Sequence, residues 1–261
     1  HPPQHSHQTH RPLSTRSIAN FGQGYTVLSS YMKRISIAID GLSASGKSTL
    51  AQGLAKALNY TYIDTGAMYR AVTLFALREK LIDHDSNLDQ EGMIRALPRV
   101  YLTFRFNPGT GRSEICLNGR NVEKEVRSHE VSRQVSVVAR LPEVREKLVV
   151  AQRRIGESGG VVMDGRDIGT VVLPHAELKF FMTASLQARG ERRHAELARR
   201  GRAVDLKDVV ANLEDRDRID STRDHSPLTQ AEDAIVIDNS DLSIEQQFDH
   251  MMACVQQVLN A

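Results

Sequence analysis

The sequence predicts an α/β fold in which helices flank a five-stranded parallel sheet. Five short apolar runs favour this class, because strands buried on both faces of a parallel sheet consist mostly of apolar and β-branched residues. The runs lie at 35–40, 60–63, 160–164, 178–182 and 234–237. The first run leads through a glycine-rich loop into a helix with one apolar face, as expected of a strand, a ligand-binding turn and a covering helix. With 261 residues and 40% hydrophobic content, the chain can bury one sizeable core and a small inserted lobe.

The glycine-rich loop matches the phosphate-binding pattern G-x-x-x-x-G-K-[ST]. Its residues are Gly41, Leu42, Ser43, Ala44, Ser45, Gly46, Lys47, Ser48 and Thr49. The glycines allow a tight turn that points backbone N–H groups inward, and the helix that follows adds its positive N-terminal end. In such a loop Lys47 reaches the β- and γ-phosphates, and the Ser48 hydroxyl holds Mg²⁺. We therefore expect a P-loop NTPase fold that binds a nucleoside triphosphate.

Charge and cysteine content exclude several classes of protein. The formal net charge is only +2, so the chain lacks the basic character of a general nucleic-acid-binding protein. Cys116 and Cys254 show no C-x-x-C spacing, which suits a reducing compartment and hence a cytoplasmic protein. No apolar run approaches the length of a membrane span, and none near the N-terminus resembles the core of a signal peptide.

The first 34 residues differ in composition from the rest. Four of the ten histidines lie in the first ten positions, and the first acidic residue is Asp40. We interpret residues 1–32 as a disordered extension, with Met32 as an alternative natural start before a domain at 33–260. A targeting peptide and a metal-binding histidine cluster remain as alternatives.

A second junction between a strand and a helix follows the strand at 60–63. The helix is expected to be capped by Thr65, and Arg70 lies near the end where another phosphate could bind. Considered alone, an ordinary N-cap with a surface arginine is the simpler interpretation. Further helices are predicted at 83–97 and after Ser243, which begins a Ser-x-x-Gln capping box.

The periodicity changes to that of an antiparallel sheet within residues 98–145. Apolar and polar residues alternate at 102–106 and again at 115–117, and Asn118-Gly119 is typical of a type I′ hairpin turn. A parallel sheet does not need such a segment at this point. We therefore interpret residues 98–145 as an inserted lobe that closes over substrate.

Charged residues follow the strand at 160–164. Asp164 ends that strand at the edge of the sheet where ligands collect, as in a Walker B strand. Arg166 and Asp167 come next, in a loop bounded by glycines. Adjacent charges near a phosphate site are costly unless they bind a charged ligand or pair with each other. A structural Arg-Asp pair is therefore the alternative to a binding role.

Residues 186–224 are predicted to form a pair of basic helices. Six arginines lie between positions 189 and 202 against two glutamates, and a second charged stretch runs from Arg216 to Arg223. An arginine-rich lid that closes on phosphates explains this excess. The alternatives are a solvated pair of charged helices and an RNA-binding patch, although the region offers little aromatic surface for stacking bases.

Together these motifs resemble the bacterial-type cytidylate kinase family over residues 33–260. The resemblance is carried by Asp64-Thr65-Gly66-Ala67-Met68-Tyr69-Arg70, by the segment from Glu130 to Arg145, by Asp164-Gly165-Arg166-Asp167-Ile168-Gly169-Thr170-Val171-Val172, and by the segment from Arg216 to Leu228. In the family, Ser often stands at the position of Thr65, and Gly at that of Ser48. The resemblance implies transfer of the γ-phosphoryl group of ATP to CMP or dCMP, with the inserted lobe in the NMP-binding region and a helical lid.

The resemblance also implies the residues of the site. The phosphate loop would hold ATP, and the acceptor site would comprise Thr65, Arg70, Ser136, Arg145, Asp164, Arg166, Asp167, Arg216, Asp220 and Arg223. Within this set, the arginines at 70, 166 and 223 would bind the acceptor phosphate, and Arg216 with Asp220 the ribose. Ser136, Arg145 and Asp167 would read the cytosine. Charge on the moving γ-phosphoryl would be neutralised by Mg²⁺ and by Lys47, Arg166, Arg189 and Arg193.

The expected partners are small molecules: CMP, dCMP and ATP, with no nucleic acid and no membrane, and the enzyme is expected to be a monomer. A P-loop kinase for another nucleoside monophosphate or small metabolite is the nearest rival. A nucleotide-driven switch or RNA-associated assembly factor is a rival from another class. It would need an N-K-x-D motif or a basic docking surface, and the chain contains neither.

Overall fold

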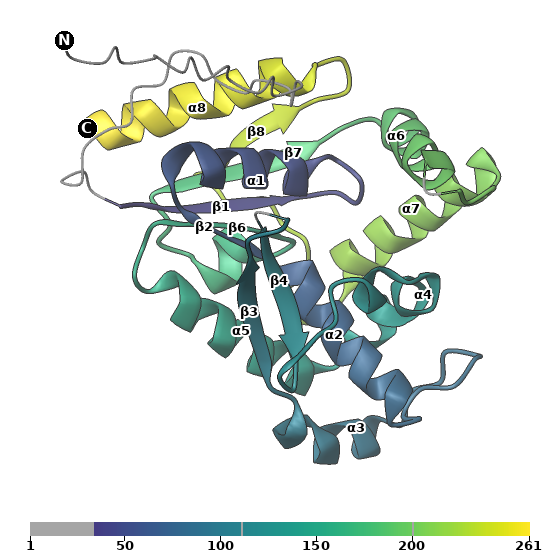
Figure 1. Cartoon of the computed structure of the whole chain (residues 1–261). Helices are drawn as coiled ribbons and strands as arrows, with labels where there is room; N and C mark the ends of the chain where they lie inside the picture. The colour runs from purple at the N-terminus through teal and green to yellow at the C-terminus, as the bar shows by residue number, and fades with distance from the viewer. Residues whose placement is uncertain (1–33, 111, 200) are drawn as a thin grey trace, which may run out of the picture. The chain divides into compact units, whose positions relative to one another are not determined.

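A parallel sheet of five strands organises the part of the chain that the computed structural model describes, namely residues 34–110, 112–199 and 201–261. The spatial order of the strands is β2-β6-β1-β7-β8 (Figure 1). Their bounds are β1 (Ser36–Gly41), β2 (Thr61–Asp64), β6 (Val161–Gly165), β7 (Leu178–Thr183) and β8 (Ile235–Asp238). All four neighbouring pairs are parallel, so the carboxyl ends of the strands lie at one edge. The predicted five-stranded sheet is confirmed.

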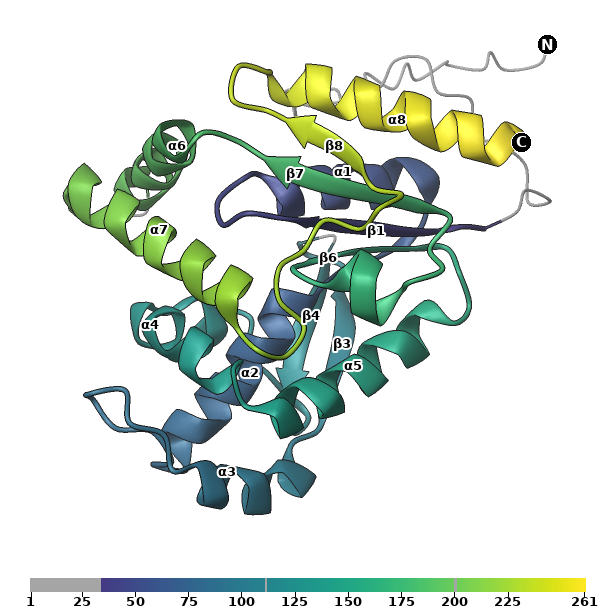
Figure 2. The ribbon, with the colours of Figure 1, turned by 180° about the vertical axis from the view of Figure 1, so that it is seen from behind.

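Helices cover both faces of this sheet (Figures 1 and 2). The helices are α1 (Lys47–Leu58) and α8 (Ile244–Asn260) on one face, and α2 (Thr65–Arg78), α5 (Pro142–Gly156) and the short π-helix η3 (Ile168–Val172) on the other. Alternation along β1 explains the two cores: Ile37 and Ile39 pack with α1 and α8, whereas Ala38 between them packs with α2. The predicted Ser-x-x-Gln capping box at Ser243 begins α8.

A second, antiparallel sheet of three strands lies in the predicted insert. Its strands are β3 (Leu102–Asn107), β4 (Arg112–Leu117) and β5 (Arg120–Asn121). Asn118 and Gly119 both have positive φ angles, of 49° and 80°, as a type I′ turn requires. The short 3₁₀-helix η2 (Glu125–Arg127) and helix α4 (His129–Val138) follow. Buried Ile115 and Val126 join the insert to the core around α2.

The helix predicted at 83–97 is wrong in its first half. Helix α3 spans only Gln90–Ala96, begins at the N-cap Asp89, and is followed by the 3₁₀-helix η1 (Leu97–Arg99). The Asp83 carboxylate accepts hydrogen bonds from the backbone N–H groups of Asp85 and Asn87, each 2.9 Å long. Such local bonds stabilise a turn in place of a helix.

Two helices, α6 (Leu186–Arg199) and α7 (Leu206–Thr222), form the predicted basic pair and pack against each other (Figure 1). They approach closely at Gly190, where a Cβ atom would lie 2.5 Å from Cγ2 of Val210. Among the described helices, none is both long enough and apolar enough to cross a membrane.

Candidate active site

The carboxyl ends of β1, β2 and β6 meet at a cleft of about 1330 Å³. The phosphate loop follows β1, Thr65 follows β2, and Arg166 follows β6, so three segments far apart in sequence converge. The described residues that line the cleft also come from the insert and from both helices of the basic pair. This is the edge of a parallel sheet at which ligands bind.

Tight packing and positive φ angles shape the phosphate loop. Gly41 has a φ of 144°, and a Cβ atom there would lie 2.0 Å from the carbonyl oxygen of Met182. Ala44 and Gly46 also adopt positive φ angles, of 57° and 88°. The Nζ atom of Lys47 donates to the carbonyl of Leu42 at 2.6 Å. Burial, and next the nearby Arg166 cation, lower the pKa of Lys47 to about 7, so a phosphate group would stabilise its charged form.

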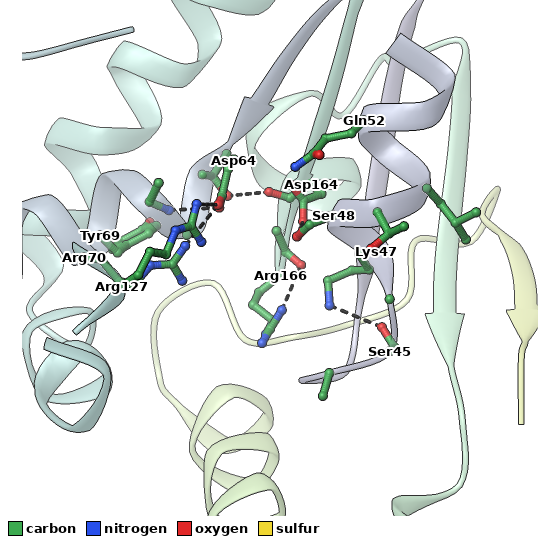
Figure 3. A pocket seen from close by; sticks show the side chains of 18 of the residues that line it. Ser45, Lys47, Ser48, Gln52, Asp64, Tyr69, Arg70, Arg127, Asp164 and Arg166 are labelled. Carbon is green, nitrogen blue, oxygen red and sulfur yellow. Dashed lines mark hydrogen bonds and ion pairs between the residues drawn. The ribbon is translucent and has the colours of Figure 1, made fainter. Parts of the chain in front are cut away.

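Oxygen atoms suited to a magnesium ion gather beside this loop. The Ser48 hydroxyl donates to Oδ2 of Asp164 at 2.8 Å, and the Tyr62 hydroxyl donates to Oδ1 at 2.9 Å. Figure 3 shows Ser48 and Asp164 facing each other in the cleft. Burial, and next the nearby Asp64 carboxylate, raise the pKa of Asp164 to about 6. A carboxylate that is short of positive charge, beside a hydroxyl, fits Mg²⁺, which prefers oxygen ligands.

The acceptor side is held together by Asp64. Its carboxylate accepts from Arg70 at 3.0 Å and from Arg127 at 2.7 Å, as Figure 3 shows. Burial opposes ionisation of Asp64, but the two arginines outweigh it and lower the pKa. Arg127, which lies in η2 of the insert, was not predicted as a site residue. The sequence offered no signal for it, because only the folded insert brings it to Asp64.

The predicted cap of α2 needs a correction. Asp64, and not Thr65, is the N-cap, and its Oδ1 accepts from the backbone N–H of Ala67 at 2.9 Å. The Thr65 hydroxyl instead donates to the backbone carbonyl of Asp164 at 2.7 Å. A carboxylate is at least as good a cap as a hydroxyl. Thr65 is thereby free to join β6 to the start of α2.

Arg166 and Asp167 each pair with a different partner, not with each other. Asp167 pairs with Arg145 at 2.5 Å, and both side chains are only 4% exposed. The Arg145 guanidinium also lies 5.2 Å from the centroid of the Tyr69 ring. Arg166 donates through Nε to Asp220 at 2.7 Å. The loop after β6 therefore ties α5 and α7 to the sheet edge.

Arg216 and Arg223 leave the acceptor side short of negative charge. Within the described part of the chain, the buried Nε atom of Arg216 has no hydrogen-bond partner, and neither has one buried terminal nitrogen of Arg223. Burial, and next the Arg166 cation, lower the pKa of Arg216 to about 10. An anion in the cleft would satisfy these donors and would stabilise the charged guanidinium groups.

Most of the predicted site residues line this one cleft. They are Ala44, Ser45, Gly46, Lys47, Ser48, Thr49, Thr65, Arg70, Ser136, Arg145, Asp164, Arg166, Asp167, Arg193, Arg216, Asp220 and Arg223. Gly41, Leu42, Ser43 and Arg189 are not among the described residues that line it. The guanidinium of Arg189 pairs with Asp217 and donates to the carbonyl of Ser43 at 3.1 Å. The structure therefore unites the acceptor set and separates Arg189 from Arg193.

A sequence profile described as cytidylate kinase matches residues 37–257, which is most of the chain. This chain belongs to the cytidylate kinase family. A protein named cytidylate kinase from Flavobacterium johnsoniae is 54% identical over 228 residues, which cover 87% of this chain and 99% of the relative. One of the same name from Bacteroides fragilis is 47% identical over 230 residues, which cover 88% of this chain and 100% of the relative.

This member of the cytidylate kinase family departs at two positions from the pattern given above. Both side chains make hydrogen bonds in the structure. Thr65 keeps the hydroxyl of the frequent Ser, and this hydroxyl donates to Asp164. Ser48, where Gly is frequent, adds a hydroxyl that donates to the same residue. Both side chains therefore place a hydroxyl against Asp164.

Asn239 links the phosphate loop to the basic helix pair and was not predicted. Its Nδ2 donates to the carbonyl of Ser45 at 2.6 Å and to Gln247 at 2.7 Å, while its Oδ1 accepts from Arg192 at 2.8 Å. Its position directly after β8, at the ligand-binding edge of the sheet, is the signal that could have identified it.

Proposed function

We propose that this chain transfers the γ-phosphoryl group of ATP to CMP or dCMP, giving ADP and CDP or dCDP. The observation that carries the proposal is a single cleft with two walls for anions. One wall is the phosphate loop with Lys47, and the other, the acceptor wall, contains the arginines at positions 70, 166 and 223. A donor phosphate chain on one wall and an acceptor phosphate on the other would bring the reacting groups together.

Polarity supports cytosine as the acceptor base. Cytosine presents an amino donor beside a ring acceptor, whereas uracil presents a carbonyl and an N–H at the same positions. The Asp167 carboxylate and the Ser136 hydroxyl can accept from the amino group, and Arg145 can donate to the ring acceptors. The buried pair of Arg145 with Asp167 supports this role, because it holds both groups in one orientation before a base arrives. Arg216 and Asp220 are assigned to the ribose.

Transfer needs positioning more than covalent help. A phosphate oxygen of CMP is already a nucleophile, so no general base is required. Lys47, Arg166 and Arg193 are assigned to neutralise charge on the passing phosphoryl group. Ser48 and Asp164 would hold Mg²⁺, which, when bound, neutralises charge on the phosphates. Arg189 pairs with Asp217 and is not among the described residues that line the cleft, so no contact with the γ-phosphoryl group is assigned to it.

The insert and the basic helix pair are assigned to cover the two substrates. Both contribute described residues to the lining of the cleft, such as Arg112 and Arg193. Closure would exclude water that otherwise hydrolyses ATP. We also propose a monomer as the active unit, acting on free nucleotides and not on nucleic acid.

An acceptor panel tests the proposed function. ADP release is measured with ATP, Mg²⁺ and one of CMP, dCMP, UMP, AMP or shikimate. We expect the highest kcat/KM for CMP or dCMP. Equal or faster turnover of UMP or AMP would identify a kinase for another nucleoside monophosphate, and turnover of shikimate alone would identify a metabolite kinase.

A further inference from the structure

Ser43 is the point at which the basic helix pair is attached to the phosphate loop. Its backbone N–H donates to Oδ1 of Asp217 at 2.9 Å, and its carbonyl accepts from Arg189 at 3.1 Å. Its hydroxyl accepts from Arg166 at 2.8 Å. All three polar groups of this buried loop residue are therefore bound by side chains from outside the loop. Figure 2 shows the loop between β1 and α1 on the side of the sheet where α6 and α7 lie.

Arg189 and Asp217 also pair with each other. Their side chains are 6% and 13% exposed, and Nε of Arg189 donates to the carbonyl of Ala184 at 3.0 Å, just before α6 begins. Arg189 lies on α6 and Asp217 on α7, so one ion pair joins the two helices and fixes both to Ser43. Close packing at Gly190 strengthens the junction. A buried pair of this kind holds one geometry, because moving one partner leaves an unpaired charge.

The same helix α7 also reaches the acceptor wall. Asp220, three residues after Asp217, accepts from Nε of Arg166, and Arg166 in turn donates to Ser43. Residues three apart lie on neighbouring positions of a helix face. One short rigid stretch of α7 therefore contacts the donor loop through Asp217 and the acceptor arginines through Asp220.

We propose that Arg189 and Asp217 are positioning residues that clamp the helix pair to the phosphate loop, and that this clamp makes ATP and CMP bind synergistically. The inference rests on the function proposed above. A donor that orders the phosphate loop fixes Ser43, Ser43 fixes α7 through the clamp, and α7 holds the acceptor residues in their binding positions. The coupling is reciprocal, so CMP tightens the binding of the donor by the same factor.

The test is calorimetric binding of CMP to the full chain with and without a saturating non-hydrolysable ATP analogue and Mg²⁺. We expect the analogue to tighten CMP binding to the wild type by about 5- to 150-fold, the usual range of such coupling. Arg189→Ala, Asp217→Ala and the double variant should each reduce this factor to about 2-fold or less, with no further loss in the double variant, because both residues act through one pair.

Asp217→Asn tests the clamp if Asp217→Ala is too unstable to measure. It keeps an acceptor for the Ser43 N–H but removes the charge that pairs with Arg189, so most of the synergy should be lost. Arg218→Ala is the matched control. Arg218 is the next residue on α7, 64% exposed and paired only with Asp215 among the contacts described, and its loss should leave synergy and turnover unchanged.

Different results would overturn the proposed function and the proposed clamp. No binding of CMP to the wild type would overturn the proposed function. CMP binding with synergy that survives in Arg189→Ala and Asp217→Asn would overturn the clamp alone. The clamp would also be overturned if Arg189→Ala lowered kcat at saturating substrates while Asp217→Ala kept wild-type turnover. Arg189 would then contact the phosphoryl group directly.

Discussion

The phosphate loop and the acceptor wall, both of which we propose to bind phosphate, are built by different means. The loop consists of nine consecutive residues, and its shape follows from its own glycines and positive φ angles. The acceptor wall draws on segments from Asp64 to Arg223, and ion pairs such as Arg145–Asp167 hold these segments together. A substitution in the loop should therefore lower turnover with little effect on stability, whereas a substitution in the acceptor wall should lower both turnover and stability.

Lys47→Ala should show the largest effect on activity and the sharpest separation from stability. We expect kcat to fall by at least about 10²- to 10³-fold, because one preorganised charge on the phosphoryl group is lost. Burial already disfavours the charge of Lys47 in the folded chain, so its removal should change Tm by less than about 4 °C. Turnover and thermal melting of the same preparation give both numbers. Near wild-type turnover, or inactivity explained by a collapsed Tm, would contradict the comparison.

The next largest effect should be on the selection of cytosine over uracil, and it tests the acceptor side of the cleft. Ser136→Ala and Asp167→Asn should each narrow the ratio of kcat/KM for CMP over UMP by about 10- to 100-fold, because a buried hydrogen-bonding group left unpaired costs about 1–3 kcal/mol. Arg166→Ala should lower kcat/KM for both substrates alike, since the phosphate is common to them. Equal losses for CMP and UMP in the Ser136 and Asp167 variants would show a purely architectural role.

The variants Asp167→Asn and Ser136→Ala should also differ in stability. Asp167→Asn removes the charge facing Arg145, and because both side chains are almost fully buried, the free energy of unfolding should fall by about 3 kcal/mol. Ser136 is only partly buried, and its truncation should cost less than about 1 kcal/mol. Urea unfolding of both variants measures the difference. A stable Asp167→Asn variant would mean that the wall does not depend on this pair.

Local patterns in the sequence were enough to predict the parallel sheet and the small antiparallel sheet. The type I′ turn at Asn118-Gly119 and the capping box at Ser243 are set by neighbouring residues, and both are confirmed. The first half of the helix predicted at 83–97 is wrong because a side chain, Asp83, competes for the backbone N–H groups that a helix would use. The hydrophobic periodicity of a sequence carries no information about such a competing side chain.

Contacts between distant segments account for what the sequence did not predict. The family resemblance indicated the acceptor residues but not Arg127, whose partner Asp64 lies 63 residues away. It also did not separate Arg189 from Arg193, because one turn of helix decides which arginine faces Ser43 and which faces the cleft. Asn239 is 194 residues from the Ser45 carbonyl that it binds. Each of these contacts depends on the completed fold.

Asp64→Asn should lower stability in a way that depends on pH. The pKa of Asp64 is lowered on folding, so its contribution is present above the unfolded value of 3.8 and is lost as the pH falls through the folded value. Asp64 is 11% exposed, but Arg127 is 38% exposed, so solvent screening reduces the expected loss at pH 7 to about 2 kcal/mol. Urea unfolding at pH 7, 5 and 3 should show an equal deficit at pH 7 and 5 and a smaller one at pH 3. A deficit that does not change with pH would mean that the paired charge is not its cause.

Deletion of residues 1–31 should have the smallest effect on activity and stability. It lies outside the described residues, so the expectation rests on sequence: the segment shows no apolar periodicity that would predict burial. The family profile begins at residue 37, and the Flavobacterium relative matches over 99% of its own length while using only 87% of this chain. Turnover with CMP and Tm should both stay at the wild-type value. A clear fall in Tm would show that the segment packs on the domain, and a fall in turnover alone would show that it contributes to the cleft.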